Sequence, residues 1–523
     1  MDILIPRTRA RFGKLEGIVL ATYSLLVGWS VAHHEPWVDE AQAWLLARDL
    51  SITDLFGKYL HYEGTPGLWH LFLWILCRLH VSYAFMHWIS AAVAVAGVWV
   101  FLRFSPFPSI LRATIPFTCF LLYQYAVIAR SYVAIPLFVF AAAALFEKPG
   151  QNLIKLSVVL GLLSNLSSHG FLLSVGFALS LAIRLWRQRK DQKGMPSIRR
   201  IAFAGAILAI SWLFSIWTAW PAPDNSYDPP STMWHLTALV IKMMPIGLSR
   251  FAPLSLFIGT SVFAYLVARR RYWDIAPCVL LQIFFAVVLV RPWHIGIMFI
   301  AVVGVVWINW PSNEAKWLSW DRSLAIVLLV SVLDQCAVSI SDISTDTRLP
   351  YSGDEGAAMF LRDRVPGKRV AGISYFSVGL LPYFPTNIYE NQPKQSFWYW
   401  SKASREVDQL SVVLKEHPDF VVLGMAWMNV QHQTSGREFM SLIMHLTPPV
   451  KKQIEEGSTY RETHRFCGDA VSGFTYHEGL CQLIFEPQAN IPQTTPQTQV
   501  LSETGAGQVE AGQGNGARIA GAR

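Results

Sequence analysis

The sequence predicts an α-helical polytopic membrane protein with a small C-terminal α/β domain outside the membrane. Hydrophobic residues make up 53% of the chain, charged residues only 15%, and the mean hydropathy is +0.34. A soluble domain has about 25% charged residues. The formal net charge of +8 does not indicate nucleic acid here, because the cations gather in short patches between apolar runs, as they do in membrane proteins.

About eleven apolar stretches are long enough, or nearly so, to cross a hydrocarbon core of about 30 Å. With the N-terminus in the cytoplasm, 20 of the 27 Lys and Arg residues before residue 341 lie inside and 7 outside, as the positive-inside rule requires. Residues 1–340 are therefore expected to form a transmembrane domain. The expected spans are residues 17–33, 84–103, 113–129, 132–147, 152–168, 170–186, 201–219, 251–268, 275–291, 294–309 and 322–340.

The loop expected outside the membrane at residues 34–83 contains the adjacent acids Asp39 and Glu40. Neighbours on a helix point about 100° apart, so one acid faces a site and the other supports it. A carboxylate can act as a general base or ligate a hard cation. The alternative is a solvated acidic helix end that is favourable to the helix dipole.

Three further ionisable clusters fall at outer junctions of the same predicted topology, in the stretches ARSYVAIP, NLSSHGF and VRPWHIG. Singly, such an arginine more often snorkels to the interface and such a histidine more often packs in the core. Their shared face favours a functional site, because ionisable groups at membrane depth are costly unless they are paired or used. Arginine forks bind phosphate, so we expect a substrate with a hydroxyl and a phosphate. The residues concerned are Arg130, Tyr132, His169, Arg291 and His294.

The composition changes after residue 340. Residues 341–485 alternate between helical and strand patterns, and we interpret them as an extracytoplasmic α/β domain. Residues 486–523 are rich in Pro, Gln, Gly and Thr and form a disordered tail. Cys467 and Cys481 both fall in the α/β domain, where a disulfide between them is our hypothesis. The aromatic residues of 383–400 are expected to serve the core and membrane docking, with glycan binding as the alternative.

The stretch WVDEAQAWLLARD, followed by YEGTPGLWHLFLWIL, resembles the first outer loop of the membrane glycosyltransferases called GT-C. The likeness is to bacterial members related to protein O-mannosyltransferases and to the aminoarabinose transferase of lipid A. ARSYVAIP resembles their R-x-Y junction, SSHGF is similar to their T-H-y-x-g turn, and RPWHIG resembles their R-H-x-G element. The resemblance covers roughly residues 10–310, and its specificity comes from the order and sidedness of the set.

This resemblance implies transfer of a sugar from a polyprenyl-phosphate carrier to an acceptor hydroxyl or amine on the outer side, with inversion. It assigns the general base to Asp39, with Glu40 as its catalytic neighbour. The residues expected to bind substrate are Arg130, Tyr132, Arg291 and His294, with Glu63, His61 and His169 on the acceptor or metal side. Some members of the family use a divalent cation and others do not, so the metal stays open. The sequence has no P-loop, GxGxxG or HExxH in a supporting context, so no nucleotide is expected to bind directly.

The expected partners are a lipid-linked sugar donor, a glycan, lipid or protein acceptor, and membrane lipids, without nucleic acid. We expect a monomer in the inner membrane of a bacterium. A transporter or flippase for a lipid-linked or anionic solute is the alternative function. Transporters show internal repeats and charges near the bilayer midplane, whereas the conspicuous charges here gather at one face. A polymerase or ligase that uses the same donors, and an inactive relative, also stay open.

Overall fold

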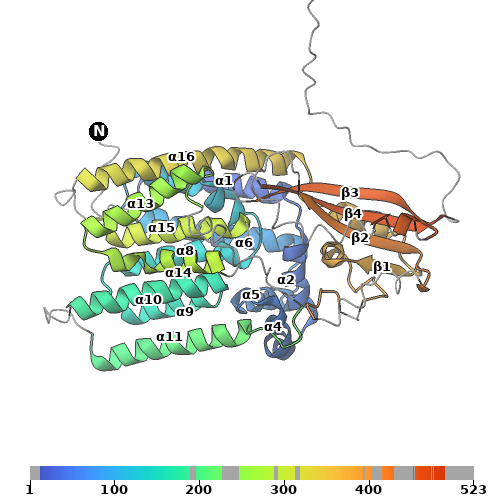
Figure 1. The fold of residues 1–523 in the computed structure, drawn as a ribbon, viewed down its shortest axis with the longest axis horizontal. Coiled ribbons are helices and arrows are strands. Elements are labelled where there is room, and N and C mark those ends of the chain that lie inside the picture. The colour runs from blue at the N-terminus through green and yellow to red at the C-terminus, as the bar shows by residue number, and fades with distance from the viewer. Residues whose placement is uncertain are drawn as a thin grey trace, which may run out of the picture.

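The computed structural model describes residues 12–188, 196–226, 247–287, 292–311, 319–392, 395–401, 415–428 and 451–488, the last without 453, 457, 473 and 475. Most of these residues are helical. The long helices pack side by side in a bundle, and a sheet lies at one end of it (Figure 1).

Six helical segments of the described residues are long and apolar enough to cross a membrane. Each has at least 18 residues, and a hydrocarbon core of about 30 Å requires about 20. This indicates an integral membrane protein. The six segments are α1 (Lys14–His33), Tyr83–Phe104 with α6 (Met86–Phe104), α10 (Ser168–Gln188), α11 (Ile198–Ala219), Pro292–Asn309 with α15 (Ile295–Asn309), and α16 (Ser319–Arg348).

Four other predicted spans correspond to shorter apolar helices, which the bundle packs among the long ones (Figure 1). A predicted span at 113–129 differs more, because the chain there is a series of short turns. Pro116 lacks an N–H and cannot continue the helix before it, and the hydroxyl of Thr118 donates to the carbonyl of Ile115 at 2.9 Å. The elements are α7 (Ser109–Thr114), α8 (Ala134–Leu145), α9 (Leu153–Ser164), α13 (Ala252–Ala268) and α14 (Ala276–Val287).

The loop predicted at 34–83 consists of short helices that lie between the bundle and the sheet (Figure 1). The longest, α2, begins where the side chain of Glu40 accepts the backbone N–H of Trp37 at 3.1 Å, which caps the first turn. The helix α5 has only 11 residues, too few to span a bilayer. The loop helices are α2 (Val38–Asp49), α3 (Ile52–Asp54), α4 (Leu60–Glu63) and α5 (Leu68–Arg78).

The C-terminal residues form a four-stranded sheet in the order β1-β2-β4-β3. β1 pairs with β2 in parallel, and the other two pairings are antiparallel. Cys467 on β3 lies opposite Cys481 on β4, and a disulfide joins them, so the predicted bridge is confirmed. The elements are α17 (Asp354–Arg362), β1 (Val370–Ile373), β2 (Phe420–Met428), β3 (Tyr460–Ser472) and β4 (Tyr476–Pro487).

The sheet is joined to the loop helices by a 3₁₀ segment, Tyr375–Tyr383, which packs against α2. Ser374 precedes it with a φ of 76°, in the left-handed region, and its hydroxyl donates to the carbonyl of Gly424 at 2.6 Å. This bond holds a conformation that is unusual for a side-chain-bearing residue. The turn ends β1 and directs the chain back toward α2.

Candidate functional site

Asp39 and Glu40 lie in the first turn of α2 and point to different neighbours, as their helical spacing predicts. Asp39 is partly exposed, whereas Glu40 is fully buried. Two distinct groups of residues therefore form around the two acids, one at the surface of the site and one behind it.

Asp39 forms an ion pair with Arg130, in which Nη1 lies 2.7 Å from Oδ2. Its other oxygen, Oδ1, accepts the hydroxyl of Tyr375 at 2.7 Å. The three residues come from α2, from the turn before α8, and from the segment that follows β1. The guanidinium of Arg130 also lies 5 to 6 Å from the ring centroids of Trp37, Tyr132 and Trp293, so aromatic faces stabilise the cation.

Tyr132, His294 and His169 continue this group beyond Arg130. The hydroxyl of Tyr132 lies 3.0 Å from Nε2 of His294, and the rings of His294 and His169 are 4.4 Å apart. His169 is buried, and neither of its ring nitrogens has a hydrogen-bond partner within the described residues. Buried polar groups are nearly always bonded to protein, water or ligand, so His169 is a group that a ligand could satisfy.

Glu63, the last residue of α4, completes the group. Its Oε1 accepts the side-chain amide of Gln42 at 2.8 Å. Burial raises the pKa of Glu63 to about 7; the hydrogen bond from Gln42 and the charge of Arg130 oppose this rise, and the charge of Asp39 adds to it. Glu63 thus interacts electrostatically with both members of the ion pair and titrates near neutral pH.

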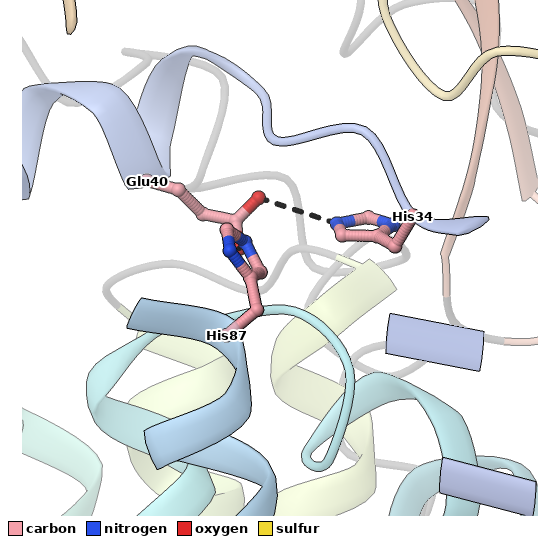
Figure 2. A group of neighbouring side chains, drawn as sticks. All are labelled: His34, Glu40 and His87. Carbon is pink, nitrogen blue, oxygen red and sulfur yellow. Dashed lines mark hydrogen bonds and ion pairs between the residues drawn. The ribbon is translucent and has the colours of Figure 1, made fainter. Parts of the chain in front are cut away.

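Glu40 reaches away from Asp39 and lies between His34 and His87 (Figure 2). Its carboxylate oxygens lie 3.4 Å from Nε2 of His34 and 2.8 Å from Nε2 of His87. The same carboxylate accepts the backbone N–H of Ala129, the residue before Arg130. Glu40 therefore connects α2 directly to the turn that carries the arginine of the site.

Glu40 and His34 stabilise each other's charged forms in this buried cluster. Burial opposes ionisation of Glu40, but His87 and His34 outweigh it and hold the pKa of Glu40 below its ordinary value. Burial also opposes the charge on His34, whereas Asp346, which lies 3.0 Å from Nδ1, and Glu40 raise the pKa of His34 to about 10. Glu40 has no exposed surface, so we assign it a supporting role in place of the predicted catalytic one.

The three side chains of this cluster are also the group within the described residues that could hold a metal ion. One ligand atom from each of His34, Glu40 and His87 lies within 4.8 Å of the others. Nitrogen and oxygen ligands of this kind suit zinc and similar cations, and the contact of His34 with Asp346 is typical of a carboxylate that orients a ligand. The hydrogen bonds of the cluster account for its geometry without an ion.

Two predicted site residues remain, His61 and Arg291. His61 lies apart, where Nδ1 is 2.8 Å from the carbonyl of Trp220 and the ring packs against Trp217. Arg291 lies outside the described residues. The structure thus brings together Asp39, Arg130, Tyr132, His169, His294 and Glu63.

Tyr375 and Gln42 were not predicted as site residues. Gln42 bonds the backbone of Trp398 in both directions, at 2.8 Å each, and so fixes part of the aromatic segment 383–400 beside α2. The rings of Trp398 and Trp400 lie 6.3 and 4.9 Å from that of Tyr375. Gln42 lies three residues after Asp39, within one helical turn, but no sequence signal pairs it with residue 398.

Comparison with known proteins gives no relative: no protein-family model, curated protein or solved structure matches this chain.

Proposed function

We propose that the chain is a membrane glycosyltransferase of the GT-C type, which moves a sugar from a polyprenyl-phosphate carrier to an acceptor hydroxyl or amine. The observation that carries the proposal is the pair of Asp39 and Arg130, 2.7 Å apart at one end of an apolar helix bundle. A carboxylate can accept a proton and a guanidinium can bind a phosphate. Transfer from a lipid phosphate uses both groups.

In the proposed reaction the acceptor oxygen or nitrogen forms a bond to the anomeric carbon while Asp39 accepts its proton. The bond from that carbon to the phosphate oxygen breaks, and its electron pair leaves with the lipid phosphate, which gives inversion. Arg130 stabilises the charge on this leaving group. Arginine has five N–H donors, so its contact with Asp39 leaves donors for the phosphate.

The surroundings of the pair support a sugar as the transferred group. Tyr375, Trp398 and Trp400 form an aromatic cluster in contact with Asp39 through the Tyr375 hydroxyl. Aromatic faces pack well on the apolar faces of sugar rings. His169 adds two ring nitrogens that have no hydrogen-bond partner in the described part of the chain, and these could bond to the phosphate or to sugar hydroxyls.

We further propose that the chain has about eleven spans, with a cytoplasmic N-terminus and residues 341–485 as an extracytoplasmic α/β domain, in the inner membrane of a bacterium. Four shorter apolar helices beside the six long ones, in α8, α9, α13 and α14, support a count close to this. The distribution of Lys and Arg supports the orientation. The disulfide between Cys467 and Cys481 supports an oxidising compartment for the sheet.

The test is transfer of radiolabelled sugar from a panel of polyprenyl-phosphate sugars in purified membranes that contain the protein. We expect label to move from at least one donor to an acceptor, in proportion to the amount of protein. A transporter would instead move label across proteoliposome membranes without forming a new glycosidic bond. Translocation without transfer would contradict the proposal.

Replacement of Arg130 by Ala is expected to lower kcat/KM for the donor by about 100- to 1000-fold, the usual effect of removing one group that stabilises developing charge. Arg130→Lys should retain part of the activity, because it keeps the charge and loses the fork. Initial rates over a range of donor concentrations measure both effects. Arg250→Ala is the control, since Arg250 is also paired with an aspartate, Asp334 at 2.8 Å, in a different place; an equal loss in this control would contradict the role of Arg130.

The pH dependence of donor binding is expected to follow Glu63. Its pKa of about 7 means that it is mostly neutral at pH 6 and mostly anionic at pH 8. The anionic form adds a negative charge beside the donor phosphate, so the donor KM should rise several-fold between these pH values. A sugar phosphodiester does not titrate in this range. Glu63→Gln should make KM nearly independent of pH, and a rise that persists in this variant would show that another group titrates.

A further inference from the structure

A second cluster of cations surrounds a cavity of about 540 Å³ at the other end of the bundle. The helix α10 begins beside the site at His169 and ends among these cations, 15 residues later at Arg184, a distance of about 22 Å along a helix. The cavity therefore lies far from the proposed transfer site. Its lining residues are Phe146, Glu147, Pro149, Arg184, Arg187, Arg269, Arg270 and Arg271.

Two of the arginines are fixed by ion pairs that form the walls of the cavity. Arg184 Nη2 lies 2.6 Å from Asp274, and it also donates to the side chain of Asn309 at 2.9 Å. Arg269 Nη2 lies 2.5 Å from Asp321. Both aspartates are buried, so the positions of these guanidinium groups are well determined.

The other three arginines have no carboxylate within ion-pair distance among the described residues. Arg187 donates to the backbone carbonyl of Arg270 at 3.3 Å. Burial and the positive charges of Arg184 and Arg187 lower the pKa of Arg271, against the effect of Asp274. Among the described residues, the five arginines that line the cavity exceed Asp274, Asp321 and Glu147 by two positive charges. Like charges this close are destabilising unless an anion lies between them.

One of these arginines, Arg270, has an unfavourable backbone conformation. Arg270 has a φ of 55° at the end of α13, in the left-handed region where glycine is the usual residue. The turn itself is secured by backbone bonds, from Arg270 N–H to Val267 and from Arg271 N–H to Leu266, at 2.8 and 2.7 Å. The strained position carries an arginine, which adds to the excess of charge.

A separate apolar hollow of about 490 Å³ is lined in part by α8. Its residues Ala144 and Leu145 directly precede Phe146, which lines the arginine cavity. The two hollows thus meet the chain within one helical turn of each other, and together they match a ligand with a charged head and an apolar tail. The remaining lining residues of the hollow are Val100, Arg103, Phe104 and Ala141.

We propose that the arginine cavity binds the phosphate headgroup of an anionic membrane lipid, with Arg187, Arg270 and Arg271 as its ligands and the hollow along α8 for an acyl chain. Guanidinium groups bond phosphate oxygens in bidentate geometry. Basic pockets between membrane helices on the cytoplasmic side recognise lipid headgroups in this way. The inference is independent of sugar transfer, because it concerns the opposite end of the bundle.

The test is native mass spectrometry of the detergent-purified full chain mixed with dioleoylphosphatidylglycerol, dioleoylphosphatidylcholine or inorganic phosphate. We expect the wild type to retain phosphatidylglycerol in preference to phosphatidylcholine, and retention to fall at high ionic strength. The double variant Arg187→Ala, Arg271→Ala should bind phosphatidylglycerol at least tenfold more weakly. It should remain folded, because neither arginine takes part in a described ion pair, and its thermal unfolding midpoint checks this directly.

Arg199→Ala is the matched control. Arg199 is an exposed arginine at the start of α11, near the end of α10, and it does not line the cavity. This variant should bind phosphatidylglycerol as the wild type does. The proposal is overturned by equal retention of the two lipids, by equal loss in the control, or by undiminished binding in the double variant. Inorganic phosphate that competes as effectively as the lipid would also overturn it, and would assign the cavity to a soluble phosphate.

Discussion

Asp39→Asn is expected to lower kcat for sugar transfer by about 100- to 10,000-fold, the range for loss of a general base. Asparagine has nearly the same shape and can still accept the hydroxyl of Tyr375, so the site should keep its form. It cannot accept a proton from the acceptor. Single-turnover transfer of labelled sugar at matched protein levels measures this effect.

Asp49→Asn is the control for this experiment. Asp49 ends the same helix and is also paired with an arginine, since Arg48 Nε lies 2.6 Å from its carboxylate. Its replacement should leave kcat within about twofold of the wild type, since surface pairs contribute little. Wild-type transfer by Asp39→Asn would exclude Asp39 as the base, and an equal loss in Asp49→Asn would show that the effect is not local.

Glu40→Gln is expected to destabilise the protein by about 3 kcal/mol or more, because it removes a buried anion that contacts His87 and leaves His34 with Asp346 alone. It should also lower kcat by about 10- to 100-fold in the folded fraction. The reason is that the carboxylate of Glu40 holds the backbone of Ala129, and a small displacement of Arg130 misplaces the group that binds phosphate. Thermal unfolding and kinetics of the same preparation separate the two effects.

Glu16→Gln is the control that separates the loss of stability from the displacement of Arg130. Glu16 is also a buried acid in the first turn of a helix, where it accepts the N–H of Gly13 at 2.9 Å and lies 2.8 Å from Arg112. Its replacement should destabilise the protein similarly but leave kcat of the folded fraction unchanged. Equal kcat in the two variants would contradict a positioning role for Glu40.

The sequence predicts the parts of the fold that depend on local pattern. Apolar runs locate the six long helices, because a helix in a membrane must be apolar over its whole length. The segment 113–129, which was predicted as a span, does not form one long helix. Its composition is apolar enough, but Pro116 and the turns after it bring Ala129 back to Glu40, and this return depends on tertiary contacts that composition does not encode.

The sequence also predicts part of the candidate site and misses another part. Residues at junctions of predicted spans, such as Arg130 and His294, could be placed on one face from topology alone. Helical geometry predicts that Asp39 and Glu40 have different roles. It does not tell which acid faces the site and which one supports it. Tyr375 could not be found, because it lies 336 residues from Asp39 and reaches it through the left-handed turn at Ser374 and the packing of its segment against α2.

The bond between Tyr375 and Asp39 determines when the proposed site becomes complete during biosynthesis. The ribosome makes Asp39 soon after the first helix, but Tyr375 follows only after the last long helix. At about 5 to 20 residues per second, the interval between them is about 15 to 70 seconds. During this time a nascent chain inserts its helices with an acid at the membrane surface but without the tyrosine that fixes it. Assembly of the C-terminal sheet is therefore the step that finishes the site, and chains released before that step carry an incomplete one.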